Sequence, residues 1–276
     1  MQNFMRQNVR VSAFVAAALT VAVGLTNVPF ARAEAGTSAW VKGNLSQVRL
    51  IAGKFDGKSY RAGIEIRLKG KAHTYWRDPG DGGVPPVFDF SKSANVKLAK
   101  VHFPAPVRSG KPGEEFIGYE RRVVFPVRVT PENAGRKATL DLKLNYAACE
   151  KICVPEQARM KLVLVRGQHN ASYAALIGTY EAKLPKPLSS PDAPRVEIKA
   201  VLAGKRWAFN VLSKTGNIVD LFVEGPEGWY FDRVSRGGGK FGVTLAQKPE
   251  RPGGPPVVHV TITSTQGAFE GRHKLP

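Results

Sequence analysis

The segment Leu140-Asp141-Leu142-Lys143-Leu144-Asn145-Tyr146 alternates apolar and polar residues at every position. This period of two is typical of a β-strand that buries one face and exposes the other. The segment Gly63-Ile64-Glu65-Ile66-Arg67-Leu68 has the same period. Further strands are predicted at residues 95–101, 122–130 and 159–166, with Gly- and Pro-bearing turns between them. The sequence from Trp40 to Val165 therefore predicts a β-sandwich.

The pattern changes between His169 and Leu184, where Tyr173, Leu176, Ile177 and Tyr180 recur at helical spacing. A short helix is predicted there, followed by a Pro-rich linker at 185–191 that continues neither helix nor sheet. Alternation then resumes, which predicts a second, smaller β-sandwich. Its expected strands are 195–202, 207–212, 218–223, 241–245 and 257–263.

The first 33 residues have the order of a secretory signal. Arg6 and Arg10 precede an apolar run from Val11 to Leu25, and Ala31-Arg32-Ala33 supplies small residues for cleavage. The run is shorter than the ~20 residues that cross a bilayer, and no later segment is apolar for that length. We expect an exported, periplasmic protein without a transmembrane segment in the mature chain. The predicted division is 1–33 signal peptide, 34–168 first sandwich, 169–191 helix and linker, and 192–276 second sandwich.

The chain carries a formal net charge of +19. Its Lys and Arg are spread along predicted strands and loops, without a dense run or an aromatic-rich motif, so nucleic acid is not an expected partner. A solvated basic surface, or attraction to acidic partners or to anionic lipid, is the expected role of this charge. The Gly- and Pro-rich segment 78–86 is predicted to be a shaped loop. Aromatic residues flank it and are expected to hold it against the core, namely Tyr75, Trp76, Phe88 and Phe90.

Cys149 and Cys153 are the two cysteines of the chain. In an extended strand their Cα atoms would lie about 13 Å apart. A helical turn would bring them to about 6 Å, inside the range that a disulfide tolerates, so the segment is expected to turn there. A bridge closing so short a loop stabilises a fold by only about 2 kcal/mol. From the residues alone, a redox-active pair and a structural bridge are about equally supported.

The segment from Asn145 to Glu156, with both cysteines, resembles the active-site segment of the N-terminal periplasmic domain of the DsbD and ScsB family. Residues 73–81 and 84–89 resemble the ScsB-type version of that domain, and 223–229 in the second half is also similar. Glu115-Phe116-Ile117-Gly118-Tyr119 is similar to the loop that caps the cysteines in this family. The resemblance is tight from Trp40 to Val165 and looser beyond.

The resemblance implies two immunoglobulin-like sandwiches and a protein-disulfide reductase type of activity without a cofactor. Cys149 and Cys153 would be the reactive pair, with Glu115, Phe116 and Tyr119 in the cap and Phe116 shielding the sulfurs. Electrons would pass from a membrane-embedded thiol reductase to oxidised periplasmic thiol proteins. The chain ends at Pro276 without the family's multi-span membrane domain, so the donor is expected to be a separate protein.

Two other functions are compatible with the sequence. A copper(I)-binding module or metallochaperone could use the thiolates of Cys149 and Cys153 with Met160, and His73 or His102 are further candidate ligands. An adhesion or assembly module would instead use the pair as a structural bridge, with a reduction potential below about −300 mV. No Ser/His/Asp set, phosphate-binding loop or paired carboxylate motif stands out, which gives hydrolase or nucleotide chemistry little support.

Overall fold

The computed structural model describes residues 36–80, 82–111, 114–168, 170–202, 204–250 and 254–276. The predicted signal peptide, 1–33, lies outside these residues. Across the described ranges, no helix combines the length and the apolar character needed to cross a membrane. Over the described residues the fold is all-β with one helix, as the alternating sequence pattern predicted.

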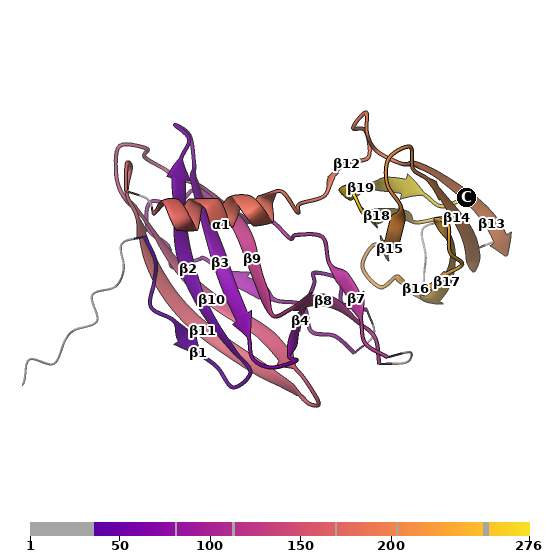
Figure 1. Cartoon of the computed structure of the whole chain (residues 1–276), viewed down its shortest axis with the longest axis horizontal. Coiled ribbons are helices and arrows are strands. Elements are labelled where there is room, and N and C mark those ends of the chain that lie inside the picture. The colour runs from indigo at the N-terminus through magenta and orange to yellow at the C-terminus, as the bar shows by residue number, and fades with distance from the viewer. Residues whose placement is uncertain (1–35, 81, 112–113, 169, 203, 251–253) are drawn as a thin grey trace, which may run out of the picture. The chain divides into compact units, whose positions relative to one another are not determined.

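Two antiparallel sheets form the first sandwich (Figure 1). The first sheet has the order β1 (Val41–Lys42), β2 (Ser46–Phe55), β3 (Tyr60–Leu68), β9 (Arg122–Thr130), β6 (Leu98–Val101). The second has the order β11 (Cys153–Leu164), β10 (Ala138–Cys149), β4 (His73–Tyr75), β8 (Phe116–Glu120), β7 (Val107–Ser109), and β5 (Val87–Asp89) also pairs with β10. In this sheet β11 is an edge strand and β10 has neighbours on both sides.

The core of this sandwich lies between the two sheets, and the apolar residues of the alternating segments point into it. Ile64 and Ile66 point inward from β3 and are fully buried, while Leu140, Leu142 and Leu144 point inward from β10. These leucines were the apolar positions of the segment that predicted the fold. The second sheet therefore turns one face to the core and its other face outward.

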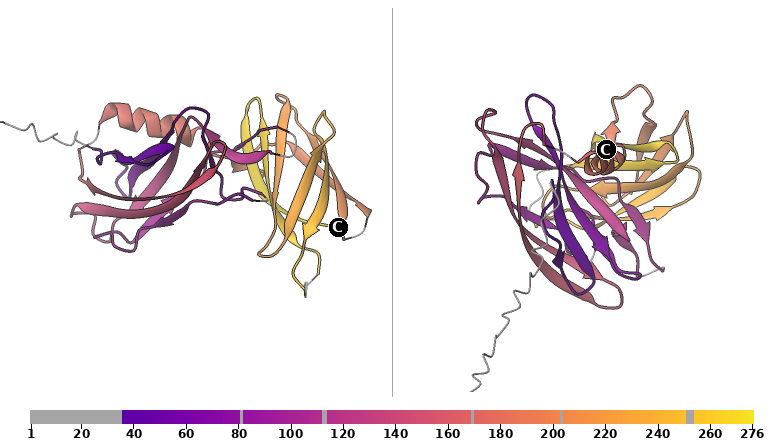
Figure 2. Two further views of the ribbon diagram at one scale, coloured as in Figure 1. Left: turned by 90° about the horizontal axis from the view of Figure 1, so that it is seen from below. Right: turned by 60° about the vertical axis from the view of Figure 1, so that its left-hand side comes forward.

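Helix α1 (Ala171–Glu181) lies against the other face of the first sheet (Figures 1 and 2). Asn170 caps its start, because its side-chain oxygen accepts a hydrogen bond of 2.8 Å from the Ser172 amide. Tyr173 and Ile177 pack on Ile51 and Val124 of the sheet. The predicted helix and its apolar face are confirmed.

The second half of the chain forms four-stranded sheets with a separate core. One has the order β12 (Lys186–Pro187), β19 (Gly267–Lys274), β18 (Val257–Ser264), β15 (Ile218–Glu224), and the other β13 (Arg195–Leu202), β14 (Arg206–Leu212), β17 (Lys240–Gln247), β16 (Tyr230–Ser235). Their strands, orange to yellow in Figure 2, form two layers around buried side chains that include Trp207, Phe209 and Ile262. The exact division of the chain at 168, 191 and 192 stays a prediction.

One local expectation for this region was wrong. The linker at 185–191 was expected to join no sheet, yet Lys186 and Pro187 form β12, which pairs in parallel with β19. Proline can take this place because β12 is an edge strand, where a missing N–H costs no ladder bond. The predicted loop at 78–86 has no strand among its described residues.

Candidate functional site

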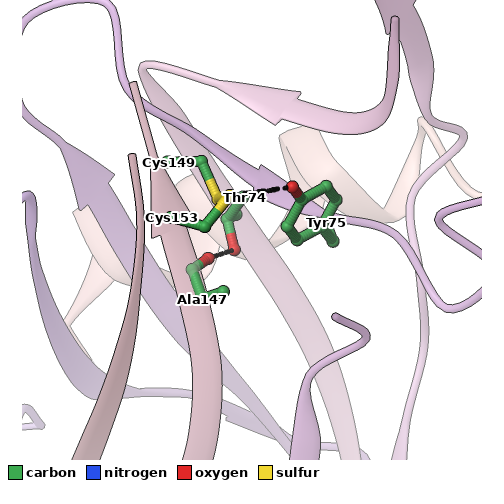
Figure 3. The surroundings of a disulfide bond; sticks show 5 residues. All are labelled: Thr74, Tyr75, Ala147, Cys149 and Cys153. Carbon is green, nitrogen blue, oxygen red and sulfur yellow. Dashed lines mark hydrogen bonds between the residues drawn. A yellow bond between two sulfur atoms is a disulfide. The ribbon is translucent and has the colours of Figure 1, made fainter. Parts of the chain in front are cut away.

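Cys149 and Cys153 form a disulfide across the hairpin of β10 and β11 (Figure 3). Cys149 ends β10 and Cys153 begins β11, and the two are register partners with Cα atoms 4.0 Å apart. Residues 150–152 make the connection. The segment turns, as the sequence requires, but by a hairpin and not by a helical turn: opposite positions on paired strands lie close enough for a bridge.

The two sulfurs differ in access to solvent. Cys149 lies on the inner strand β10 and is 1% exposed, packed with Tyr75, Ala147 and Phe116. Cys153 lies on the edge strand β11 and is exposed. A partner thiolate can therefore reach the sulfur of Cys153, whereas Cys149 is covered.

The Tyr75 hydroxyl lies against both sulfurs, 3.2 Å from Cys153 Sγ and 3.3 Å from Cys149 Sγ (Figure 3). Because disulfide sulfurs carry no hydrogen, the hydroxyl is the donor. Burial raises the pKa of Tyr75, which keeps it protonated. The sequence pattern predicts only a packing role for Tyr75, because its place beside the sulfurs depends on the pairing of β4 with β10, which the pattern does not specify.

Phe116, on β8 at the far side of β4, packs against the buried cluster formed by Tyr75, Ala147 and Cys149. Its ring stacks on the imidazole of His73 with centroids 3.6 Å apart and planes 7° apart. Strand β8 approaches β4 closely at Gly118, where any Cβ would lie 2.0 Å from the carbonyl oxygen of Thr74. A glycine at this position therefore lets the strand that carries Phe116 pack against the strand that carries His73 and Tyr75.

The other two predicted cap residues do not cover the sulfurs. Glu115 is exposed, with its carboxylate 4.0 Å from the guanidinium of Arg108. Tyr119 is a register partner of Thr74 and belongs to the core between the sheets, where its hydroxyl donates to the Pro104 carbonyl at 2.7 Å. Successive residues of a strand point to opposite faces, so Phe116 and Tyr119, three positions apart, cannot share a face.

A buried carboxylate fastens the hairpin on its core side. Glu156, three residues after Cys153, accepts hydrogen bonds from the Leu45 amide at 2.9 Å, from the Tyr146 hydroxyl at 2.8 Å and from the Ser46 hydroxyl. Ser46 begins β2, so this network joins the sheet that carries the cysteines to the facing sheet. The hairpin is therefore held in place by groups other than the disulfide.

His73 is the titratable side chain nearest in sheet register to the buried sulfur. It pairs with Cys149 across β4 and β10, and with Glu120 across β4 and β8. Burial lowers the pKa of His73, and the negative charge of Glu120 partly offsets this effect. The imidazole is therefore neutral at pH 7, and its ring is free to accept a proton.

Of the candidate copper ligands, His73 lies beside the cysteines as the register partner of Cys149, whereas Met160 and His102 lie elsewhere in the fold. Met160 is buried in the sandwich core, and seven strand positions separate it from Cys153, about 23 Å along β11. His102 lines a hollow with Pro126, Arg128 and Glu181. Within the described residues, no cluster of three or more His, Cys, Asp or Glu side chains is placed to hold a metal ion.

Comparisons with known proteins agree with this geometry. Residues 45–165 match the protein-family model described as "Thiol:disulfide interchange protein DsbD, N-terminal". The crystal structure of the N-terminal periplasmic domain of ScsB from Proteus mirabilis superposes with a TM-score of 0.69 at 19% identity, covering 88% of this chain and 99% of that one. At that identity the likeness shows the fold.

A second solved structure, a conserved domain protein from Bacillus anthracis, has a TM-score of 0.22 at 10% identity, over 81% of this chain and 76% of that one, which is too low to carry an argument. No curated protein matches the sequence.

Proposed function

We propose, from the premise that residues 45–165 are a domain of the DsbD N-terminal family, that this protein exchanges electrons with other proteins through the Cys149–Cys153 pair. The observation that supports this most strongly is the asymmetry of the disulfide: Cys153 is exposed, and Cys149 is buried in a cluster on which Phe116 packs. Thiol–disulfide exchange needs one accessible sulfur to form a mixed disulfide and a second one to resolve it.

In the proposed cycle the reduced pair begins with Cys153. Its thiolate attacks a substrate disulfide, forms a mixed disulfide and releases one substrate sulfur as a thiolate. The Cys149 thiolate then attacks Cys153 Sγ, closes the Cys149–Cys153 bond and expels the second substrate sulfur. The substrate disulfide gains two electrons and two protons, and the cysteine pair loses them. Reduction by the donor runs the same steps backwards.

Tyr75 and Phe116 assist this cycle in different ways. The Tyr75 hydroxyl, already within 3.3 Å of both sulfurs, would stabilise either thiolate by donating a hydrogen bond. Phe116 would keep small oxidants away from Cys149 until a partner displaces the cap. The open position of Cys153 lets a partner dock while the cap is still closed.

A purely structural bridge is less well supported by this arrangement. The short loop between the cysteines limits the stabilisation to about 2 kcal/mol. Backbone pairing along the whole of β10 and β11, with the Glu156 network beneath, already fixes the hairpin. The pair is therefore free to open without loss of the sheet, as a cycling disulfide requires.

The direction of electron flow follows from the family. We propose a membrane-embedded thiol reductase as donor and oxidised periplasmic thiol proteins as acceptors, with the chain exported by the signal sequence at 1–33. The similar ScsB structure is itself described as a periplasmic domain, which supports this location. The proposed electron transfer needs no cofactor, because cysteine sulfurs carry both electrons.

Single-cysteine variants test the assignment of the two sulfurs. The Cys149→Ser chain keeps the exposed Cys153 and is expected to form a mixed disulfide with oxidised glutathione within minutes, seen as a mass increase. The Cys153→Ser chain keeps only the covered Cys149 and is expected to react at least tenfold more slowly, since cap opening must come first. Equal rates would contradict the assignment, and no adduct with either variant would contradict the proposed function.

A further inference from the structure

Four residues form one row across four adjacent strands of the second sheet. Cys153 pairs with Cys149, Cys149 with His73, and His73 with Glu120, on β11, β10, β4 and β8 in that order. Register partners point to the same face of a sheet, and their Cβ atoms lie about 4.5–5.5 Å apart. The row thus places a thiol pair, an imidazole and a carboxylate side by side on the face that carries the disulfide.

The Cys149 thiol requires a nearby proton acceptor during the cycle. It resolves the mixed disulfide as a thiolate, but it is 1% exposed and packed against Phe116, Tyr75 and Ala147. Burial in apolar surroundings raises the pKa of a thiol, and the covered sulfur has little access to a water molecule that could take the proton. A neighbouring side chain that accepts a proton near neutral pH would remove this barrier.

The groups around Cys149 differ in their capacity to do this. Tyr75 touches the sulfur, but its raised pKa makes it a hydrogen-bond donor rather than a base. Glu115 is exposed, beside Arg108. Glu120 is exposed as well, and its carboxylate accepts a hydrogen bond of 2.7 Å from the Ser109 hydroxyl. His73 is half-buried, neutral at pH 7 and the direct cross-strand partner of Cys149.

We infer that His73 is the general base that deprotonates Cys149 in the resolving step. This inference rests on the proposed function, since it names the proton acceptor of that cycle. The proton of the Cys149 thiol passes to a ring nitrogen of His73. The Cys149 thiolate then attacks Cys153 Sγ, the Cys149–Cys153 bond forms, and the electron pair of the broken bond leaves with the substrate sulfur. The imidazolium returns its proton to that sulfur or to water, and every proton and electron is accounted for.

The same geometry serves the reverse reaction. When a donor thiolate attacks Cys153 Sγ, Cys149 is the leaving sulfur, and a protonated His73 returns the proton to it. Glu120 is the charged group that acts electrostatically on His73, and it favours the imidazolium. The other groups facing His73 are Phe116, stacked on its ring, Tyr75, edge-on at 5.4 Å between centroids, and the Cys149 thiol. Carboxylate, imidazole and thiol thus follow one another along the row, and the charge of Glu120 favours the protonated form of the base.

The two steps separate in the reaction of the reduced chain with the aromatic disulfide dithiobis(nitrobenzoate). Attack by Cys153 releases a first nitrothiobenzoate, and resolution by Cys149 releases a second, both followed by absorbance. In His73→Phe, which keeps a ring to stack on Phe116, we expect the second release at pH 7 to slow by about 100-fold while the first changes by less than about twofold. In wild type, the rate of the second release is expected to fall as pH drops through the pKa of His73. This inflection should disappear in His73→Phe. In Glu120→Gln it should move to lower pH, because Glu120 raises the pKa of His73.

His102→Phe is the matched control, since burial also lowers the pKa of this half-buried histidine, which lies on a segment outside the row. Thermal melting establishes that each variant is folded. An equal second phase in His73→Phe and His102→Phe would overturn the inference, as would equal slowing of both phases in His73→Phe, which would reduce His73 to a support for the cap. A wild-type chain that releases only one equivalent would overturn the proposed function itself, and this result is distinct from the others.

Discussion

Replacement of Tyr75 by Phe removes one oxygen atom that lies 3.2 and 3.3 Å from the two sulfurs. In the oxidised pair this hydroxyl donates to neutral sulfur, a hydrogen bond of about 0.5 kcal/mol, whereas in the reduced pair above the thiol pKa it donates to a thiolate, at about 2 kcal/mol. The difference of roughly 1.5 kcal/mol favours the reduced form in wild type. Tyr75→Phe should therefore raise the thiol pKa by about one unit and make the reduction potential about 30 mV more negative.

The assay is the equilibrium of each variant with reduced and oxidised glutathione above the thiol pKa, read by alkylation and mass. The matched control is Tyr119→Phe, which loses a hydroxyl bonded to the Pro104 carbonyl on the opposite face of the sheet. It should lose about 1 kcal/mol of stability and keep the wild-type potential. A Tyr75→Phe potential within 5 mV of that of Tyr119→Phe would refute the role given to the hydroxyl.

Three further changes follow from contacts at the site and in the second sandwich. Phe116→Ala removes a stacked ring contact of about 0.5–1.5 kcal/mol. In the Cys153→Ser background, Cys149 should then react about 2- to 10-fold faster with hydrogen peroxide. An unchanged rate would refute the capping role of Phe116. Glu156→Gln places an amide against donors and should lower the free energy of unfolding in urea by about 3 kcal/mol; a loss under about 0.5 kcal/mol would contradict the buried network. Hydrogen bonds from His259 and from Arg77 lower the pKa of Glu270 to about 2. The stabilisation by this carboxylate is therefore present above the unfolded pKa of 4.5 and is lost as pH falls toward 2. Glu270→Gln should flatten the pH dependence of stability in that range, and an unchanged dependence would exclude the ion pair as its source.

Sequence alternation predicted the strands whose two faces differ in environment. β10 alternates buried and partly exposed residues along most of its length. β3 alternates in sequence because one face carries core isoleucines and the other carries Glu65, which is buried among arginine side chains. β2 was not predicted, because α1 covers its second face and its residues are buried in a continuous run from Val48 to Gly53, without alternation. β4 and β8 were missed for another reason: each is too short to show a period.

The cysteine pair was visible in the sequence, but most of its surroundings were not. Phe116 was named through a family resemblance, and it packs on the cluster that contains Cys149. Tyr75 and His73 lie more than seventy positions before the cysteines, and only the register of β4 against β10 brings them to the sulfurs. Register depends on long-range pairing, which local patterns do not encode. Tyr119 belongs to the same sequence motif as Phe116, but its side chain packs in the core between the sheets and not at the site.

The proposed function requires that the Cys149–Cys153 disulfide opens and closes reversibly while the sheet around it stays folded. The most direct measurement is the redox titration of the mature chain with glutathione, with thiols counted by alkylation and folding followed by circular dichroism in the same samples. We expect a reversible two-electron transition at a potential above about −300 mV with an unchanged spectrum. A pair that stays oxidised below that potential, or that is reduced only as the spectrum of the folded protein is lost, would contradict it.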